Sequence, residues 1–134
     1  MEVVLDSNIL FRIFISQGDI TKLVFDDGLL LYAPLKLREE FLNNKAEILE
    51  KSKLSEKDFG KLCSLLFGRI IFVPLDEYRQ FLPEAKQLLG KHEKDEDFIA
   101  LCLARKIQLW TYESLLIKLG FGVSTKKIAE TLSK

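Results

Sequence analysis

Short, mostly apolar runs alternate along the chain with longer segments in which apolar residues recur at helical spacing. The runs at 3–5, 29–33, 69–73 and 107–111 predict strands, and Val3-Val4-Leu5 is too apolar for a strand with one side in water, so this strand is expected to be buried on both faces. A shorter run at 121–123 is a candidate fifth strand. Strands of this kind are typical of parallel sheets.

The segments between these runs predict helices that cover the sheet. Strands that alternate with helices form βαβ units, so the chain is expected to have an α/β fold: a parallel sheet of four or five strands with helices on both faces. The expected helices span 8–15, 19–26, 35–51, 55–68, 95–105, 113–119 and 124–132, with a further helical segment through Tyr78, Phe81 and Leu88 that Pro83 breaks or kinks.

Composition narrows the functional classes. The 134 residues have the length of one domain, expected over 1–134. The 20 basic and 20 acidic residues balance, which argues against a tight non-specific DNA coat protein.

No secretion signal or membrane span is recognisable, so a soluble, cytoplasmic protein without a membrane partner is expected. Cys63 and Cys102 lie in apolar helical patterns and are expected to be small buried hydrophobes.

Acidic residues recur at corresponding places in the βαβ units. Asp6 directly follows the first strand, Glu39 and Glu40 lie in the first turns of the helix after the second, and Glu113 follows the fourth. Ligands of open α/β sheets bind outside the carboxyl ends of the strands, which makes these positions candidates for chemistry. Asp6 or Ser7 could instead cap the helix that follows; we assign the chemistry to Asp6 and the capping to Ser7.

The helix over 95–105 carries another candidate acid. At 100° per residue, Asp95 lies on the same side as Ile99 and Cys102, so it is expected to face the core. Asp97 lies on the opposite side and is expected to be an exposed acid of the first turn.

Several carboxylates near one another repel unless a cation neutralises them. No lysine or arginine neighbours Asp6 or Thr111 in the sequence, and no histidine or thiol accompanies these acids. Oxygen ligands alone favour Mg²⁺ or Mn²⁺ over zinc. Such ions assist phosphodiester hydrolysis by activating water, so a metal-dependent nuclease is the function that these residues indicate.

Other catalytic classes find little support. The single histidine, His92, lies in a charged segment and is expected to be a solvated loop residue. No glycine-rich phosphate-binding motif follows the first strand, and the lysine that a flavodoxin-like phosphoacceptor domain would need after a late strand is missing from Thr111-Tyr112-Glu113. Five phenylalanines fit core positions better than base-stacking ones: Phe11, Phe14, Phe59, Phe67 and Phe72.

Four segments in this order resemble the successive acidic motifs of the PIN-domain family. They are Val3-Val4-Leu5-Asp6-Ser7-Asn8-Ile9-Leu10, Ala33-Pro34 with Glu40-Phe41, Asp95 before Ile99-Ala100-Leu101, and Leu109-Trp110-Thr111-Tyr112-Glu113. The resemblance implies a three-layer α/β/α sandwich whose acidic pocket binds Mg²⁺ or Mn²⁺. It also implies cleavage of single-stranded RNA; many small members are VapC-like toxins, paired with an antitoxin protein and homodimeric.

The resemblance assigns roles to individual residues. Asp6, Glu40, Asp95 and Glu113 match the catalytic, metal-binding acids, and Asn8 and Thr111 match residues that position water or phosphate. The apolar residue after Glu40 favours it as the second acid, whereas the helical wheel favours Glu39. Glu113 stands where the family usually has aspartate.

Two hypotheses remain. The first is a metal-dependent endoribonuclease, and the second is a module of the same fold that holds RNA or a protein partner without cleaving it. Candidate basic residues for an RNA-binding rim are Lys36, Arg38, Lys126 and Lys127.

Overall fold

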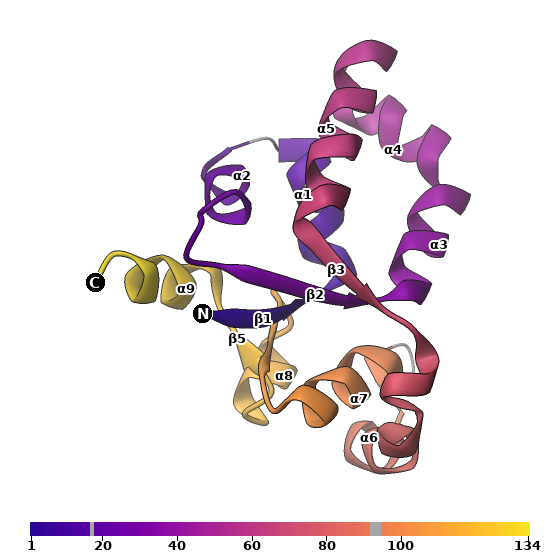
Figure 1. Ribbon diagram of the computed structural model, residues 1–134, viewed down its shortest axis with the longest axis vertical. Coiled ribbons are helices and arrows are strands. Elements are labelled where there is room, and N and C mark those ends of the chain that lie inside the picture. The colour runs from indigo at the N-terminus through magenta and orange to yellow at the C-terminus, as the bar shows by residue number, and fades with distance from the viewer. Residues whose placement is uncertain (17, 92–94) are drawn as a thin grey trace.

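The fold is a five-stranded parallel sheet between two layers of helices, seen in a computed structural model that describes residues 1–16, 18–91 and 95–134 (Figure 1). Strands β2 and β4 flank the central strand β1, giving the order β3-β2-β1-β4-β5. The strands are β1 (Glu2–Leu5), β2 (Leu30–Pro34), β3 (Ile70–Val73), β4 (Gln108–Trp110) and β5 (Gly122–Val123).

Helices cover both faces of this sheet. Figure 1 shows the helices α1 to α5 on one side and α6 to α8 on the other, with α9 beside α2. The helices are α1 (Ser7–Ser16), α2 (Asp19–Val24), α3 (Leu35–Asn43), α4 (Lys45–Ser52), α5 (Glu56–Arg69), α6 (Leu82–Leu89), α7 (Glu96–Arg105), α8 (Ser114–Lys118) and α9 (Thr125–Leu132), with short 3₁₀ turns η1 (Leu75–Glu77) and η2 (Arg79–Phe81). The expected three-layer α/β/α architecture is confirmed.

The strand order determines where a ligand can bind. All four strand pairings are parallel, so the carboxyl ends of the strands meet at one edge of the sheet. The strand order changes direction at β1. The next strands in the sequence, β2 and β3, lie on one side of it, whereas β4 and β5 lie on the other. The crevice at such a reversal is the usual binding position of open α/β sheets. Here it lies between the residues that follow Leu5 and Trp110.

The core explains why the apolar runs predict buried strands. Val3, Val4 and Leu5 of β1 are fully buried between the two helical layers. On one face, Phe14 of α1 lies 5.0 Å from Phe41 and 5.1 Å from Phe59, measured between ring centroids. Burying a side chain of this size contributes roughly 1.5–3 kcal/mol to stability. Phe14 and Phe59 are buried as expected, whereas three others are half-buried: Phe11, Phe67 and Phe72.

Some expected helix boundaries are wrong. The helix expected over 35–51 is two helices, because Asn44 leaves the helical conformation (φ −108°, ψ 11°) and its side-chain amide donates to the Glu40 carbonyl at 2.8 Å. Helix α5 passes through Gly68 to Arg69. Pro83 does not break a helix but lies in the first turn of α6, where its missing N–H would have no partner in any case.

The remaining expectations concern single residues and membrane spans. Cys102 is buried and Cys63 half-buried, and both are free thiols. Burial raises the pKa of the Cys102 thiol, which keeps it protonated and inert. His92 lies outside the described residues. Within the described ranges, no helix combines the length and the apolar composition needed to cross a bilayer.

Candidate active site

Asp6 is a buried carboxylate at the carboxyl end of the central strand. Its backbone N–H continues the pairing of β1 with β4 by donating to the Trp110 carbonyl at 3.1 Å. Its side chain accepts a 2.6 Å hydrogen bond from the Thr111 hydroxyl. The expectation that Ser7 caps the following helix is wrong, because α1 begins at Ser7 and the Ser7 hydroxyl instead points to the Asp6 carboxylate at 3.5 Å.

Thr111 ties the ends of β1 and β4 together. It is fully buried, and its hydroxyl both donates to Asp6 and accepts from the Glu113 backbone N–H at 3.0 Å. A hydroxyl engaged in this way has no direct route to solvent. We therefore expect Thr111 to act through Asp6 and Glu113, not by touching water or phosphate itself.

The surroundings of Asp6 disfavour its negative charge. Burial raises the pKa of Asp6, and the negative charge of Glu113 raises it further, while hydrogen bonds from Thr111 and Ser7 oppose the shift. A carboxylate whose pKa is perturbed by burial and by a neighbouring charge is a candidate functional group.

A cavity of about 370 Å³ opens beside Asp6 at the carboxyl edge of the sheet. It gathers residues from the start of α1, from α3, from the segment before α7 and from the segment after β4. Asp6 itself lies next to the lining, adjoining it through Ser7. The lining residues are Ser7, Asn8, Lys36, Glu40, Asp95, Phe98 and Glu113. The structure therefore brings all the sequence-predicted site residues to this cavity or, for Asp6 and Thr111, directly behind it.

Glu40 and Glu39 lie in different cavities. Glu40 lines the one beside Asp6, with its carboxylate 4.0 Å from the Lys36 ammonium. Glu39 lines a neighbouring cavity of about 300 Å³ together with Tyr78 and Asp97. The geometry favours Glu40 as the second acid of the set.

Asp97 is not the exposed acid that the helical wheel predicts. Its side chain is only 18% exposed, and it lies 3.6 Å from the Lys36 ammonium. The hydroxyl of Tyr78, a buried residue from the segment between β3 and α6, donates to it at 2.6 Å. Burial and this hydrogen bond raise the pKa of Tyr78, so the phenol stays a donor. Asp97 thus fixes Lys36 at the wall between the two cavities.

The donor set of the cavity suits a hard cation. Its acids offer only carboxylate oxygens, Asn8 adds an amide, and none of its described lining residues carries an imidazole or a thiol. Mg²⁺ and Mn²⁺ prefer oxygen ligands and keep several waters. Within the part of the chain that the structure describes, no three acidic, histidine or cysteine side chains lie close enough to hold an ion together. The chemistry of the donors fits Mg²⁺ or Mn²⁺, and the side chains would have to turn inward to bind it.

A sequence profile of the PIN domain matches residues 4–133, nearly the whole chain. The chain belongs to the PIN-domain family. Comparisons with curated proteins and with solved structures gave no significant match. PIN domains are generally nucleases and typically use divalent metal ions, which agrees with an oxygen-lined cavity at the edge of the sheet.

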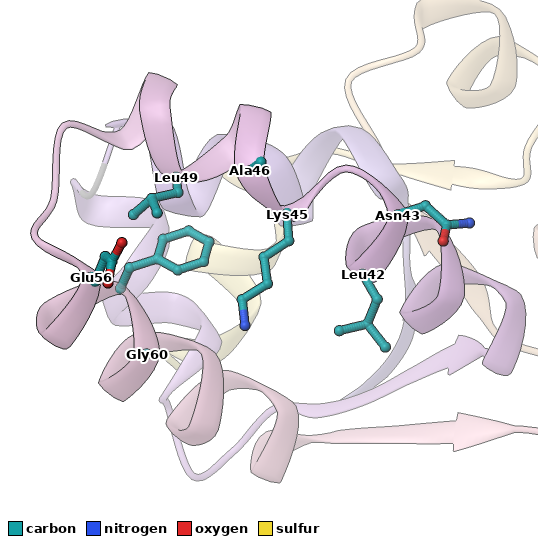
Figure 2. A pocket seen from close by; sticks show the side chains of 8 residues that line it. Leu42, Asn43, Lys45, Ala46, Leu49, Glu56 and Gly60 are labelled. Carbon is teal, nitrogen blue, oxygen red and sulfur yellow. The ribbon is translucent and has the colours of Figure 1, made fainter.

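The most voluminous of the cavities described for residues 1–16, 18–91 and 95–134 lies elsewhere. It encloses about 570 Å³ between the helices α3 and α4 on one side and α5 on the other. Figure 2 shows the Lys45 side chain extending into it, with Leu49 on one side and Leu42 on the other. None of the sequence-predicted site residues lines it, so its size alone does not make it the site of chemistry.

Two residues of the PIN domain that the sequence analysis missed lie beside the acidic cavity. Asn8 also lines a cavity of about 380 Å³ that includes Arg12 and Tyr112. The Arg12 guanidinium lies 5.4 Å from the centre of the Tyr112 ring. The sequence offered one signal for Tyr112, namely its position between the predicted site residues Thr111 and Glu113. Of the four basic rim candidates, Lys36 lines the acidic cavity and three do not: Arg38, Lys126 and Lys127.

Proposed function

We propose that this PIN domain is an Mg²⁺- or Mn²⁺-dependent endoribonuclease that cleaves single-stranded RNA with water as the nucleophile. One observation carries the proposal: Asp6, held by Thr111 at the reversal of strand order, adjoins a cavity that Glu40, Asp95 and Glu113 also reach. Carboxylates from four separate segments would not converge at the ligand-binding edge for stability alone, because their mutual repulsion costs free energy.

Each residue has a distinct task in this proposal. Asp6, Glu40, Asp95 and Glu113 would hold the ion, which when bound supplies Lewis acidity and lowers the pKa of a water molecule. Thr111 fixes the direction of the Asp6 carboxylate. Asn8 presents an amide to the cavity and can orient water or a phosphate oxygen.

Calorimetric titration with Mn²⁺, run beside cleavage of a single-stranded RNA, tests the proposal. The unaltered chain should bind Mn²⁺ and cleave, and Asp6→Asn should lose both. Asp19→Asn is a matched control, because Asp19 is fully exposed in α2 and lines none of the cavities described above. Absence of metal-dependent heat, or cleavage unaffected by Asp6→Asn, would contradict the proposal.

A second function is a module of the same fold that binds RNA or a protein partner without cleaving it. Two observations favour it. No described set of three acidic side chains is assembled for a metal ion, and the Lys36 ammonium already lies 4.0 Å from Glu40. Binding of RNA without Mn²⁺-dependent cleavage would support this function over the first.

The biological setting is a further proposal. A toxin of a toxin–antitoxin pair, working as a homodimer, is what the family resemblance suggests. Growth arrest on expression of the unaltered chain, relieved by Asp6→Asn and by co-expression of a small protein encoded next to it, would support this setting. Normal growth on expression of an active chain would favour a stand-alone nuclease.

A further inference from the structure

Arg12 and Tyr112 form an open, partly aromatic surface beside the acidic cavity. The Tyr112 side chain is 46% exposed, and the neighbouring Ile15 is 45% exposed. Together with Asn8 and Phe11 they line the cavity of about 380 Å³. Asn8 lines this cavity and the acidic one, so the two adjoin.

Tyr112 is held at a fixed distance from the chemistry by its neighbours in the chain. Thr111 before it is buried and bonded to Asp6, and Glu113 after it lines the acidic cavity. The ring therefore lies at the rim of that cavity, anchored by the same hydrogen bonds that position Asp6.

The other two tyrosines differ from Tyr112. The buried Tyr32 donates to Glu2 at 2.9 Å, and the buried Tyr78 donates to Asp97 at 2.6 Å. Among the described residues, Tyr112 has no hydrogen-bond partner and Arg12 has no ion-pair partner. Half of a large aromatic ring and a guanidinium are thus left to solvent at the edge of the candidate site.

A second arginine–tyrosine pair shows what a purely structural contact looks like here. The Arg105 guanidinium lies 3.9 Å from the centre of the Tyr32 ring and donates to the Tyr32 hydroxyl at 3.0 Å. The Arg12 guanidinium is 5.4 Å from the Tyr112 ring, without such a hydrogen bond among the described residues. Its donors and one face of the ring remain free for a ligand.

We propose that Arg12 and Tyr112 bind one unpaired base of the nucleic-acid strand next to the phosphate that is cleaved. This inference rests on the proposed function, since it names the feature of the substrate that the same site recognises. An exposed aromatic ring stacks with any base, and a planar guanidinium can stack on a base while donating to the neighbouring phosphate. The cavity walls supply both groups on one side of the acids.

This arrangement predicts a preference for single strands. A base within a duplex is already stacked and paired, so it must leave the helix before it can reach Tyr112. Stacking has little sequence preference, because every base has an aromatic face. The subsite therefore selects unpaired nucleic acid of many sequences.

Direct binding measurements separate this inference from the question of cleavage. Fluorescence anisotropy of a labelled single-stranded RNA with the full chain carrying Asp6→Asn reports affinity whether or not the chain cleaves. In this background, Tyr112→Ala should weaken binding about 5- to 150-fold, the range for loss of one stacked base. Tyr112→Phe keeps the ring and should stay within about twofold.

The charge of Arg12 should be visible in the salt dependence of RNA binding. Arg12→Gln should weaken binding and reduce the slope of log affinity against log salt by about 0.7, as expected for one lost phosphate contact to a single strand. Arg105→Gln is the matched control and should leave affinity and slope unchanged, because Arg105 packs on Tyr32. Leu119→Ala, a truncation of another exposed apolar residue, is the control for Tyr112→Ala.

Removing the bases of the RNA one at a time locates the position of the strand that the subsite binds. An abasic residue at one position of the strand should weaken binding to the Asp6→Asn chain and have no effect once Tyr112→Ala is added. The inference is overturned if the Asp6→Asn chain does not bind the RNA, or if Tyr112→Ala binds as tightly as its parent. It is equally overturned if Tyr112→Ala changes the oligomeric state measured by sedimentation, because this face would then bind a second copy of the chain. Failure of the unaltered chain to cleave RNA contradicts only the proposed function.

Discussion

Replacing Thr111 by valine removes one buried hydroxyl while nearly keeping the shape of the side chain. That hydroxyl donates to the Asp6 carboxylate at 2.6 Å and accepts from the Glu113 N–H at 3.0 Å. The substitution therefore cuts the side-chain hydrogen bond that joins the ends of β1 and β4 at the candidate site.

The cost follows from these two bonds. A hydrogen bond to a charged group contributes about 1.5–3 kcal/mol, and removing its donor leaves the Asp6 carboxylate under-solvated. The Glu113 N–H is only partly buried and can turn to water, so its loss adds about 1 kcal/mol or less. We expect Thr111→Val to lower the free energy of unfolding by about 2–4 kcal/mol at neutral pH.

The pH dependence identifies the cause. The Thr111 hydrogen bond lowers the pKa of Asp6 and so stabilises its ionised form in the folded chain. That contribution is present above the pKa of Asp6 and is lost as the pH falls through it. The cost of Thr111→Val should therefore be largest at neutral pH and should shrink in acid.

Urea unfolding followed by the fluorescence of Trp110 measures these values. Trp110 is the chain's single tryptophan and is fully buried beside Thr111. Thr131→Val, at an exposed threonine of α9, is the matched control and should change stability by no more than about 0.5 kcal/mol. The cost of Thr111→Val should also fall in an Asp6→Asn background. A cost that is independent of pH and equally large in that background would refute the role assigned to the Thr111 hydroxyl.

Three further predictions concern stability, each checked by urea unfolding without metal. Because burial raises the pKa of Asp6, its ionised form destabilises the fold above that pKa; Asp6→Asn should add about 0.5–2 kcal/mol at neutral pH, a gain that disappears as the pH falls through the pKa of Asp6. Gly122→Ala should lower the free energy of unfolding by about 1–3 kcal/mol, because the new Cβ would lie 2.8 Å from Ile117 Cγ1 and 2.9 Å from the Ile117 backbone nitrogen. An unchanged free energy of unfolding would show that β5 can shift to accommodate the new methyl group without cost. Tyr78→Phe should cost about 1.5–3 kcal/mol by removing the 2.6 Å bond to Asp97, and an unchanged midpoint would mean that water replaces it.

Local patterns predicted the layers of the fold but not the order of its strands. Runs such as Val3-Val4-Leu5 identify buried strands because apolar burial is recorded in each run separately. The order β3-β2-β1-β4-β5 depends on how crossovers pass over the sheet, and no single segment carries that information.

The same distinction applies to the candidate site. The place of Asp6 follows from its position after a strand, whereas the burial of Asp97 depends on Tyr78, a residue 19 positions away that the helical wheel does not include. The helical wheel favoured Glu39, but Glu40 lines the acidic cavity and Glu39 a neighbouring one, because a wheel assigns a side chain to a helix face and not to one of two adjacent cavities. Tyr112 and Arg12 were missed because each is ordinary in its own segment, and only the fold brings them within 5.4 Å.

The hydrogen bond between Thr111 and Asp6 also has a consequence for folding during synthesis. Its partners are 105 residues apart, and β1 cannot pair with β4 until residues 108–110 have been made. Contacts of such long sequence separation form late and slowly. A growing chain therefore carries Asp6 for about a hundred residues of synthesis before it acquires Thr111, the partner that fixes the carboxylate. If the proposed nuclease needs both, RNA close to the ribosome is safe from an unfinished chain.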